Sequence, residues 1–397
     1  MQVKVEKLDD LGRGIAFIDN KVTFIPSGIP GDIINVKITK EKKNYNEGEV
    51  TEFIKTSPLR VEAKCPYFSI CGGCQLQSLP YEKTIEYKKE KVTNLFKKNK
   101  IDINIDTVVN THPYNYRNKI NMKVVDGKMG FYVNKTHNVV EIDECLLASD
   151  AINKSIHLIK NNIKNGEVTI RCNQNKEVLI SIISNDLLDI DINHLKEKIK
   201  LVGIVINDKT YYGENFLFER MNNLLFKVSN DAFFQVNPYV ATKLFQIIED
   251  NVSKSDKVLD LYCGVGTLSL CAAKKGASVL GVEVVENAVL NALFNAKINN
   301  LENVNFVLND VDEVISKISM DFNKVIVDPP RSGLTKNVIE VLLKIRPDEI
   351  IYVSCDPQTL VRDYMLLSEV YKIRKAYILD MFSYTYHVES ILILTRK

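Results

Sequence analysis

The sequence predicts an α/β protein whose C-terminal part is a doubly wound parallel sheet, preceded by a small β-barrel and a central α+β region. Residues 1–56 alternate short β-rich runs with turns, and from about residue 256 strand patterns alternate with helical ones. A cysteine-rich segment opens the mixed region between them. We therefore expect three domains, at residues 1–56, 57–225 and 226–397, as a length of 397 residues allows.

The composition is that of a globular protein, with 45% hydrophobic and 26% charged residues and a formal net charge of +2. No apolar run reaches the roughly 18 residues of a membrane span. No signal peptide precedes Val3, so we expect a cytoplasmic protein with no membrane partner. Basic residues cluster locally, as at residues 88–91, and each such run is interpreted as a solvated face.

The first 56 residues predict five short strands, with turns at residues 19–20, 27–28 and 30–32. Strands at this spacing favour a barrel of the OB-like kind, which often binds nucleic acid but can also only pack against a neighbour. The order of Gly12-Arg13-Gly14 and Pro30-Gly31-Asp32 resembles the TRAM domain. That resemblance implies an RNA-binding barrel.

Three cysteines within ten residues, Cys65, Cys71 and Cys74, can converge on one metal centre that the distant Cys145 completes. Four sulfur ligands suit either zinc or an iron–sulfur cluster. The spacing lacks the double C-x-x-C of a zinc ribbon, which favours a cluster, but it leaves both metals open. The alternative is a set of free thiols.

The region after the cysteines begins with a lysine-rich pattern that predicts a helix over residues 81–100. Its apolar positions share one inner face: Ile85, Val92, Leu95 and Phe96. Residues 116–124 then read as a strand with alternate basic groups, Arg117, Lys119 and Lys123, on one face. Phosphates or bases can meet that face, although a solvated strand gives the same pattern.

Four strand patterns in the C-terminal part cover residues 257–262, 279–283, 306–310 and 324–328. Three of them end in a carboxylate, at Glu283, Asp310 and Asp328, and ligands of open α/β sheets bind at such carboxyl ends. The glycine turn after the first strand does not have the spacing of a dinucleotide site, and the segment contains no phosphate-binding P-loop.

The same layout is typical of an S-adenosylmethionine site. The glycine turn lets the backbone approach a ligand closely, and Glu283, 21 residues after Tyr262, is placed to accept both ribose hydroxyls. Asp310 is placed to meet an adenine edge. The alternative is a Rossmann-like core without a nucleotide.

Cys355 follows a buried strand pattern at residues 351–354, and Asp356-Pro357 opens a predicted helix through about Leu367. The partial positive charge of a helix N-terminus favours the thiolate form of such a cysteine. An ordinary buried cysteine fits the same local pattern.

A thiolate beside a methyl donor suggests methylation of a poor carbon nucleophile, such as C5 of a pyrimidine. Addition of Cys355 to C6 makes C5 nucleophilic, and a base must then remove the C5 proton. Glu389, just before the last strand, is the natural base, with His387 as its rival. Asp328 would favour uracil, which carries a proton at N3, although cytosine remains an alternative.

Six motifs together resemble the RNA uracil-C5 methyltransferase family that carries a TRAM domain and a 4Fe–4S cluster. They are the four cysteines, Phe233-Phe234-Gln235-Val236-Asn237, Asp260-Leu261-Tyr262-Cys263-Gly264-Val265-Gly266, Asp328-Pro329-Pro330-Arg331, Ser354-Cys355-Asp356-Pro357 and His387-Val388-Glu389-Ser390.

The resemblance implies a nucleophile at Cys355, a base at Glu389 and a 4Fe–4S cluster on Cys65, Cys71, Cys74 and Cys145. It also implies a pocket for S-adenosylmethionine and uracil, formed by Gln235, Tyr262, Glu283, Asp310 and Asp328. In the family's fold a segment matching residues 82–110 packs with the catalytic domain.

The implied substrate is structured RNA, with 23S ribosomal RNA expected first and transfer RNA second. The target uridine must be flipped out, because a stacked base shields C6 from the thiolate. Phe233, Phe234 and Tyr384 are candidates to stack on it, although each fits a core position equally well. We expect a monomer. The alternative outside enzymes is an RNA-binding protein without activity.

Overall fold

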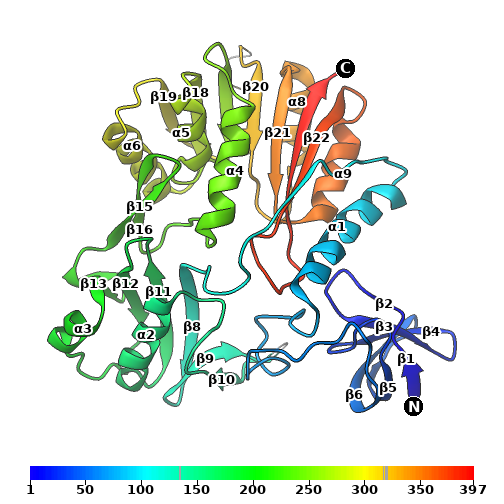
Figure 1. Ribbon diagram of the computed structural model, residues 1–397. Coiled ribbons are helices and arrows are strands. Elements are labelled where there is room, and N and C mark those ends of the chain that lie inside the picture. Colours follow the sequence, from blue (N-terminus) through cyan, green and yellow to red (C-terminus); the bar gives the residue numbers. More distant parts are fainter. Residues whose placement is uncertain (134–135, 316, 318–320) are drawn as a thin grey trace.

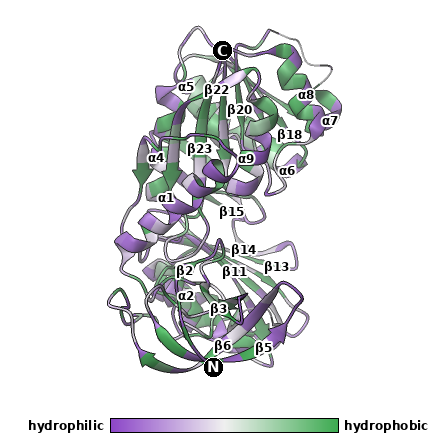
Figure 2. Cartoon of the chain, turned by 90° about the vertical axis from the view of Figure 1, so that its right-hand side faces the viewer, coloured by the Kyte–Doolittle hydropathy of each residue, from purple (hydrophilic) through white to green (hydrophobic). Residues whose placement is uncertain are grey.

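A computed structural model describes residues 1–133, 136–315, 317 and 321–397. The chain forms two lobes, with the C-terminal sheet and its helices in one and the N-terminal and central sheets in the other (Figures 1 and 2). Across the described ranges, none of the helices is both long and apolar enough to span a bilayer.

The N-terminal domain is a six-stranded sheet in the order β1-β5-β6-β4-β3-β2 around a small apolar core. Five strands were predicted here, and the additional one, β2, has only two residues and hence no readable pattern. The strands are β1 (Gln2–Lys4), β2 (Lys7–Leu8), β3 (Gly14–Ile18), β4 (Lys21–Ile25), β5 (Ile33–Glu41) and β6 (Tyr45–Lys55).

The central domain is a seven-stranded sheet in the order β10-β9-β8-β11-β12-β13-β14, whose apolar core includes α2 and α3. Its strands are β8 (Lys119–Val125), β9 (Lys128–Tyr132), β10 (Val139–Glu141), β11 (Gly166–Cys172), β12 (Glu177–Ile183), β13 (Lys200–Ile206) and β14 (Lys209–Gly213). Its helices are α2 (Asp150–Ile159), the 3₁₀ turn η1 (Lys160–Asn162) and α3 (Ile192–Lys198).

A hairpin of β15 (Phe216–Met221) and β16 (Leu224–Ser229) joins the two lobes. The expected domain boundary between residues 225 and 226 falls inside β16. Side chains of α6 (Glu286–Ile298) and of the residue after it hold this strand, because Asn299 and Asn295 accept the backbone N–H groups of Leu225 and Lys227 at 2.8 and 2.6 Å.

The C-terminal sheet has eight strands in the order β19-β18-β17-β20-β21-β23-β22-β7. Strands β17 to β21 run parallel, and β23 is antiparallel to β21. The strands are β17 (Lys257–Leu261), β18 (Ser278–Glu283), β19 (Val304–Leu308), β20 (Lys324–Val327), β21 (Glu349–Ser354), β22 (Tyr371–Leu379), β23 (Glu389–Arg396) and β7 (Thr107–Val109).

Helices cover both faces of this sheet, whose strands are largely apolar (Figure 2). Side chains on the same face as Val258 pack toward α4 and α5. Side chains on the opposite face, such as that of Leu259, pack toward α1, α8 and α9. The alternation follows from the period of two along a strand. The helices are α1 (Tyr81–Lys98), α4 (Pro238–Asp250), α5 (Thr267–Lys274), α6, α7 (Val311–Val314), α8 (Lys336–Ile345) and α9 (Pro357–Leu367).

Helix α1 and strand β7 precede the central domain in the chain but lie in the C-terminal lobe. Helix α1 packs beside α9 (Figure 1), with Val92, Leu95 and Phe96 in the shared apolar core. Residues 107–109 pair in parallel with residues 377–379 of β22. The edge of the C-terminal sheet is therefore completed by a segment from the first third of the chain.

Candidate active site

The carboxyl edge of the C-terminal sheet gathers most of the predicted site residues. The chain order along the sheet reverses beside β17, which pairs with both β18 and β20, and this reversal is where open α/β sheets bind ligands. Residues 262–266 follow β17, Asp328 follows β20 and Cys355 follows β21. Glu389 opens the antiparallel strand β23, which brings it to the same edge.

The turn after β17 leaves room for a ligand. Tyr262, Gly264 and Gly266 all have positive φ angles, of 65°, 55° and 83°. Such a conformation is costly for Tyr262, and strain of this kind clusters at functional sites. A Cβ atom added at Gly264 would meet no atom of the described residues within 4 Å. The backbone therefore presents an open concave surface at this turn.

Glu283 is fixed beside that turn by three backbone N–H groups. One carboxylate oxygen accepts from Gly264 at 2.9 Å, and the other accepts from Val284 and Val285, each at 2.9 Å. Asp310 is exposed and caps α7 by accepting the N–H of Asp312 at 2.7 Å. The carboxylate of Glu283 is thus held at the end of β18 with its remaining lone pairs available to a ligand.

Cys355, Glu389 and Asp328 lie close together. Ser354 pairs with Ser390 across the antiparallel strands β21 and β23, so the next residues, Cys355 and Glu389, face each other. Cys355 is half-buried and Glu389 is 5% exposed. The negative charges of Glu389 and Asp328 are the two strongest electrostatic influences on the Cys355 thiol.

The prediction that the helix N-terminus favours the Cys355 thiolate is wrong for the free protein. Burial, then Glu389, then Asp328 raise the pKa of Cys355 to about 11, while Arg331 lowers it. In addition, Asp356 caps α9 by accepting the N–H of Gln358 at 2.8 Å, so its carboxylate offsets the positive end of the helix. Cys355 therefore rests as the neutral thiol.

The two carboxyl groups beside it also have raised pKa values. Burial and the neighbouring Asp328 raise the pKa of Glu389 well above its ordinary value, against a lowering by Arg331. Burial raises the pKa of Asp328. The rival base His387 has a pKa lowered to about 4 by burial and by Arg331 and nearby lysines, so it stays neutral. Its ring lies tilted by 38° against that of Tyr386, with ring centroids 4.2 Å apart.

The segment containing Gln235 is held by the central sheet. Asn118 donates to the main-chain oxygen atoms of Gln235 and Val236 at 3.3 and 3.0 Å, and Arg171 donates to that of Ala232 at 2.6 Å. Gln235 itself is 8% exposed. This clamp fixes the segment at the junction between the two lobes.

The three aromatic residues proposed for stacking differ sharply in exposure. Phe233 is 70% exposed, whereas Phe234 is 2% and Tyr384 is 7% exposed. Phe234 packs in the core beside Phe226, and the hydroxyl of Tyr384 is hydrogen-bonded to that of Tyr114. Among the three, Phe233 is the one whose ring is available to a base.

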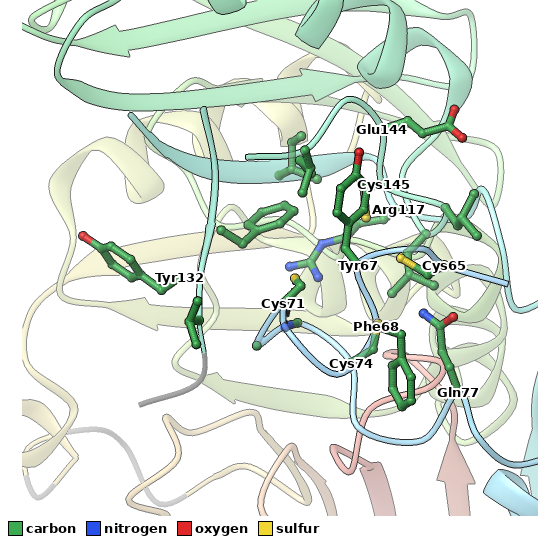
Figure 3. Close-up of a pocket in the computed structure, with 18 of the residues that line it drawn as sticks. Cys65, Tyr67, Phe68, Cys71, Cys74, Gln77, Arg117, Tyr132, Glu144 and Cys145 are labelled. Carbon is green, nitrogen blue, oxygen red and sulfur yellow. Dashed lines mark hydrogen bonds between the residues drawn. The ribbon is translucent and has the colours of Figure 1, made fainter. Parts of the chain in front are cut away.

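The four predicted metal-ligating cysteines line one cavity of about 520 Å³ in the central domain (Figure 3). All four are free thiols. Burial and the proximity of Cys145, Cys71 and Cys65 raise the pKa of Cys74 to about 12. Arg117 lines the same cavity. Thiols gathered in this way have the chemistry of a sulfur ligand set.

The side chains of these four cysteines are not arranged as a closed coordination shell. Within the part of the chain that the structure describes, no three Cys, His, Asp or Glu side chains are grouped so that they could hold a metal ion. The predicted ligands therefore share one cavity, but the described side chains are not arranged there as a metal site.

Two residues near the site were missed by the sequence interpretation. Residues 88–91 were interpreted as a solvated face, which is wrong for Lys88, because its side chain is 1% exposed and ion-paired with Asp380. Helical spacing could have predicted this burial, since Lys88 lies four residues before Val92 and shares the inner face of α1. Asp380 begins the loop that leads to Glu389.

An α/β sheet with a glycine turn, a strand-end acid and a ligand-binding carboxyl edge defines the fold of an S-adenosylmethionine-dependent methyltransferase. Residues 80–397 match the model of the tRNA (uracil-5-)-methyltransferase family, and residues 1–51 match the TRAM domain. The chain therefore belongs to the tRNA (uracil-5-)-methyltransferase family, which confirms the resemblance predicted from its motifs.

Relatives agree with this family over the full chain. An RNA methyltransferase of Clostridium tetani is 33% identical over 444 aligned positions that cover 100% of this chain and 97% of the relative. One from Halalkalibacterium halodurans is 31% identical with the same coverage. The crystal structure of Pyrococcus abyssi tRNA (uracil-54, C5)-methyltransferase with S-adenosyl-L-homocysteine superimposes with a TM-score of 0.83, at 27% identity and 100% coverage of both chains. The protein is thus an RNA methyltransferase.

Proposed function

We propose that this protein methylates C5 of a uridine in structured RNA through a temporary covalent bond between Cys355 and C6. The observation that carries the proposal is the position of Cys355 opposite Glu389, with Asp328 beside them, at the open carboxyl edge of the sheet. A nucleophile, a base and a donor site then share one cleft, as the reaction requires.

The donor would lie against the turn of residues 262–266, where it supplies an electrophilic methyl group. Glu283 would accept the ribose hydroxyls, because its carboxylate is already oriented by three backbone N–H groups. Tyr262 and Gln235 would line the cleft, with Asp310 on the adenine side. Room at Gly264 supports this arrangement.

Cys355 would lose its thiol proton to solvent and add as the thiolate to C6 of the flipped uracil, and the π electrons of the C5–C6 bond would move to C5. C5 would then attack the sulfonium methyl group of the donor, whose C–S bond breaks to release S-adenosylhomocysteine. Glu389 as a carboxylate would next remove the C5 proton. The C–H electron pair re-forms the double bond and expels the Cys355 thiolate. The raised pKa of Glu389 suits a group that must hold a proton after this step.

Uracil would be preferred over cytosine because it presents a donor at N3. A carboxylate at Asp328 accepts that proton, whereas cytosine offers only a lone pair there. Phe233, whose ring is exposed, would contact the flipped base or its neighbour.

Ribosomal RNA is our first choice of substrate, because the four cysteines match the cluster-bearing type of the family predicted from the sequence. Transfer RNA is the second, and it is favoured by the likeness to the Pyrococcus abyssi enzyme. Mapping 5-methyluridine in both RNA pools from cells lacking the gene distinguishes them. A methylated cytidine in place of uridine would reject the assignment of Asp328.

Cys65, Cys71, Cys74 and Cys145 would hold a 4Fe–4S cluster that fixes the loop of residues 65–74 to the central sheet. The shared cavity supports this proposal. Anaerobically purified protein should be brown, with absorption near 400 nm that is lost in Cys74→Ser. A colourless protein that contains stoichiometric zinc would contradict it.

The nucleophile is tested with Cys355→Ala, labelled donor and total RNA from cells lacking the gene. Methyl transfer should fall by at least about a thousandfold, as it does when other covalent enzymes lose their nucleophile. Cys271→Ala is the matched control, because Cys271 is fully buried in α5. Methyl transfer by Cys355→Ala at the control's rate would reject the mechanism.

The base is tested with Glu389→Gln, which removes the proton acceptor at nearly constant size. A covalent protein–RNA adduct carrying the labelled methyl group should accumulate and survive denaturing electrophoresis. If wild type turns over while Glu389→Gln releases product equally fast, another group removes the C5 proton.

A further inference from the structure

The loop between β22 and β23, residues 380–388, sets the position of Glu389. Leu379, the last residue of β22, pairs with Glu389, the first residue of β23, so the loop is closed by this pair. Asp380 and Val388 are its first and last residues. A shift at Asp380 is therefore passed to Glu389 across a single strand pair. We call residues 380–388 the base loop.

Lys88 of helix α1 holds the start of the base loop. Its ammonium group donates to a carboxylate oxygen of Asp380 and, at 2.8 Å, to the main-chain oxygen of Phe382. The two charged side chains are 1% and 0% exposed. The N-terminal half of α1, where Lys88 lies, runs beside the base loop in Figure 1. This ion pair joins residues 292 positions apart in the chain.

Other donors satisfy the rest of Asp380. The hydroxyls of Tyr81 and Ser383 donate to its second carboxylate oxygen at 2.6 and 2.8 Å, and its N–H donates to Val109 of β7 at 2.8 Å. One helical turn after Lys88, Lys91 donates to the main-chain oxygen of Tyr386 at 2.9 Å. The base loop is thus held along most of its length by a segment outside the catalytic part of the chain.

A buried ion pair is a poor source of stability, because the cost of desolvating both charges offsets most of their attraction. Its geometry is nevertheless strict, since either partner left alone is an uncompensated buried charge. A pair of this kind next to a reacting group is better explained by the position that it imposes. Displacing a reacting group by about 1 Å can cost about a hundredfold in rate.

We propose that Lys88 is a positioning residue for the final step of the reaction. Through Asp380 and Phe382 it holds the base loop so that Glu389 faces the C5 proton of the adduct. The inference rests on the proposed function of Glu389. Lys88 takes no part in the earlier bond between Cys355 and C6, because Cys355 is carried by β21 and α9 and not by the base loop.

The position of Lys88 predicts that its replacement slows release of the methylated RNA but not methyl transfer. In Lys88→Met, methyl transfer in the first turnover should stay within about threefold of wild type. Release of the methylated RNA should slow by about tenfold or more, because the carboxylate is misplaced. A methylated covalent adduct should therefore accumulate, as in Glu389→Gln. A merely destabilised protein would lose both steps in parallel.

The experiment uses full-length protein, S-adenosylmethionine labelled in the methyl group, and total RNA from cells lacking the gene. Adduct and free methylated RNA are separated on denaturing gels over time. Lys89→Met is the matched control, because Lys89 is the exposed neighbour on the same helix. It should behave as wild type.

Two further variants keep the test valid if Lys88→Met folds poorly. The double variant Lys88→Met/Asp380→Asn removes both buried charges, so it should be more thermally stable than Lys88→Met alone. It should still accumulate the methylated covalent adduct. Tyr81→Phe removes one hydrogen bond to Asp380 and should lengthen the adduct lifetime by a smaller factor. Release at the wild-type rate in these variants would overturn the inference.

Glu389→Gln distinguishes the role of Lys88 from the proposed role of Glu389. If Glu389→Gln traps no adduct, the proposed role of Glu389 fails. If Glu389→Gln traps the adduct and the Lys88 variants release product normally, Glu389 remains the base and the role of Lys88 fails.

Discussion

Replacing Gly264 with alanine tests whether the turn after β17 holds the methyl donor. Gly264 has a φ of 55°, and a Cβ atom there would meet nothing within 4 Å among the described residues. The substitution therefore has two separable effects. It places an L-residue in a left-handed conformation, and it projects a methyl group into the space proposed for the donor.

The first effect can be estimated from the backbone alone. A left-handed conformation costs about 1–2 kcal/mol for a residue with a Cβ atom. With no clash to relieve, the loss of stability should remain in that range. The second effect should weaken donor binding by at least about tenfold, or about 1.4 kcal/mol, because the backbone can no longer approach the ligand.

Gly127 provides the matched control. Its φ is 77°, a Cβ there likewise meets nothing within 4 Å of the described chain, and it lies in the turn between β8 and β9 of the central domain. Gly127→Ala should carry a similar conformational cost without the loss of binding. Urea unfolding measures stability, and calorimetry with S-adenosylhomocysteine measures the Kd. Equal Kd values for both variants would refute the assignment of the donor site to this turn.

Three further predictions follow from the burial and charge of single residues. Because burial and two carboxylates raise the pKa of Cys355 to about 11, the thiolate fraction and hence the methylation rate should rise about tenfold per pH unit from pH 6 to 8, and a flat profile would contradict a resting thiol. Lys324→Met should lower the free energy of unfolding by about 1–3 kcal/mol, because it removes the ion pairs of Lys324 with Asp256 at 3.3 Å and Glu349 at 3.0 Å while Arg374 still pairs with Glu349; a loss below about 0.5 kcal/mol in urea would show that these pairs are not coupled. Phe234→Ala should cost about 3–5 kcal/mol, whereas Phe233→Ala should slow adduct formation with little loss of stability, so the reverse pattern would exchange their roles.

The carboxyl-edge residues could be predicted because each one follows a readable strand. Cys355 comes directly after the buried residues of β21, and the acids Glu283 and Asp328 stand at or just after the ends of β18 and β20. Strand direction then brings them together without any knowledge of contacts. The helix from Pro357 to Leu367 has the bounds that were predicted from its Asp-Pro start.

The remaining features depend on contacts between distant segments. Burial and carboxylates outside its own strand and helix raise the pKa of Cys355, whereas the local helix alone predicted that it would be lowered. Lys88 was interpreted as solvated because its partner Asp380 lies 292 residues away. Strand β7 has three residues, too few for a pattern, and only the family resemblance indicated where that segment packs.

The crossing of helix α1 into the C-terminal lobe has a consequence for biosynthesis. Lys88 and β7 emerge from the ribosome far ahead of Asp380 and β22, since 292 residues separate the ion-paired side chains. At about 5–20 residues per second, that interval lasts about 15–60 s. During this interval the apolar side of helix α1 lacks the later segments, such as α9, against which it packs in the folded protein. A chain that stalls before β22 would therefore leave this apolar side exposed to aggregation and proteolysis.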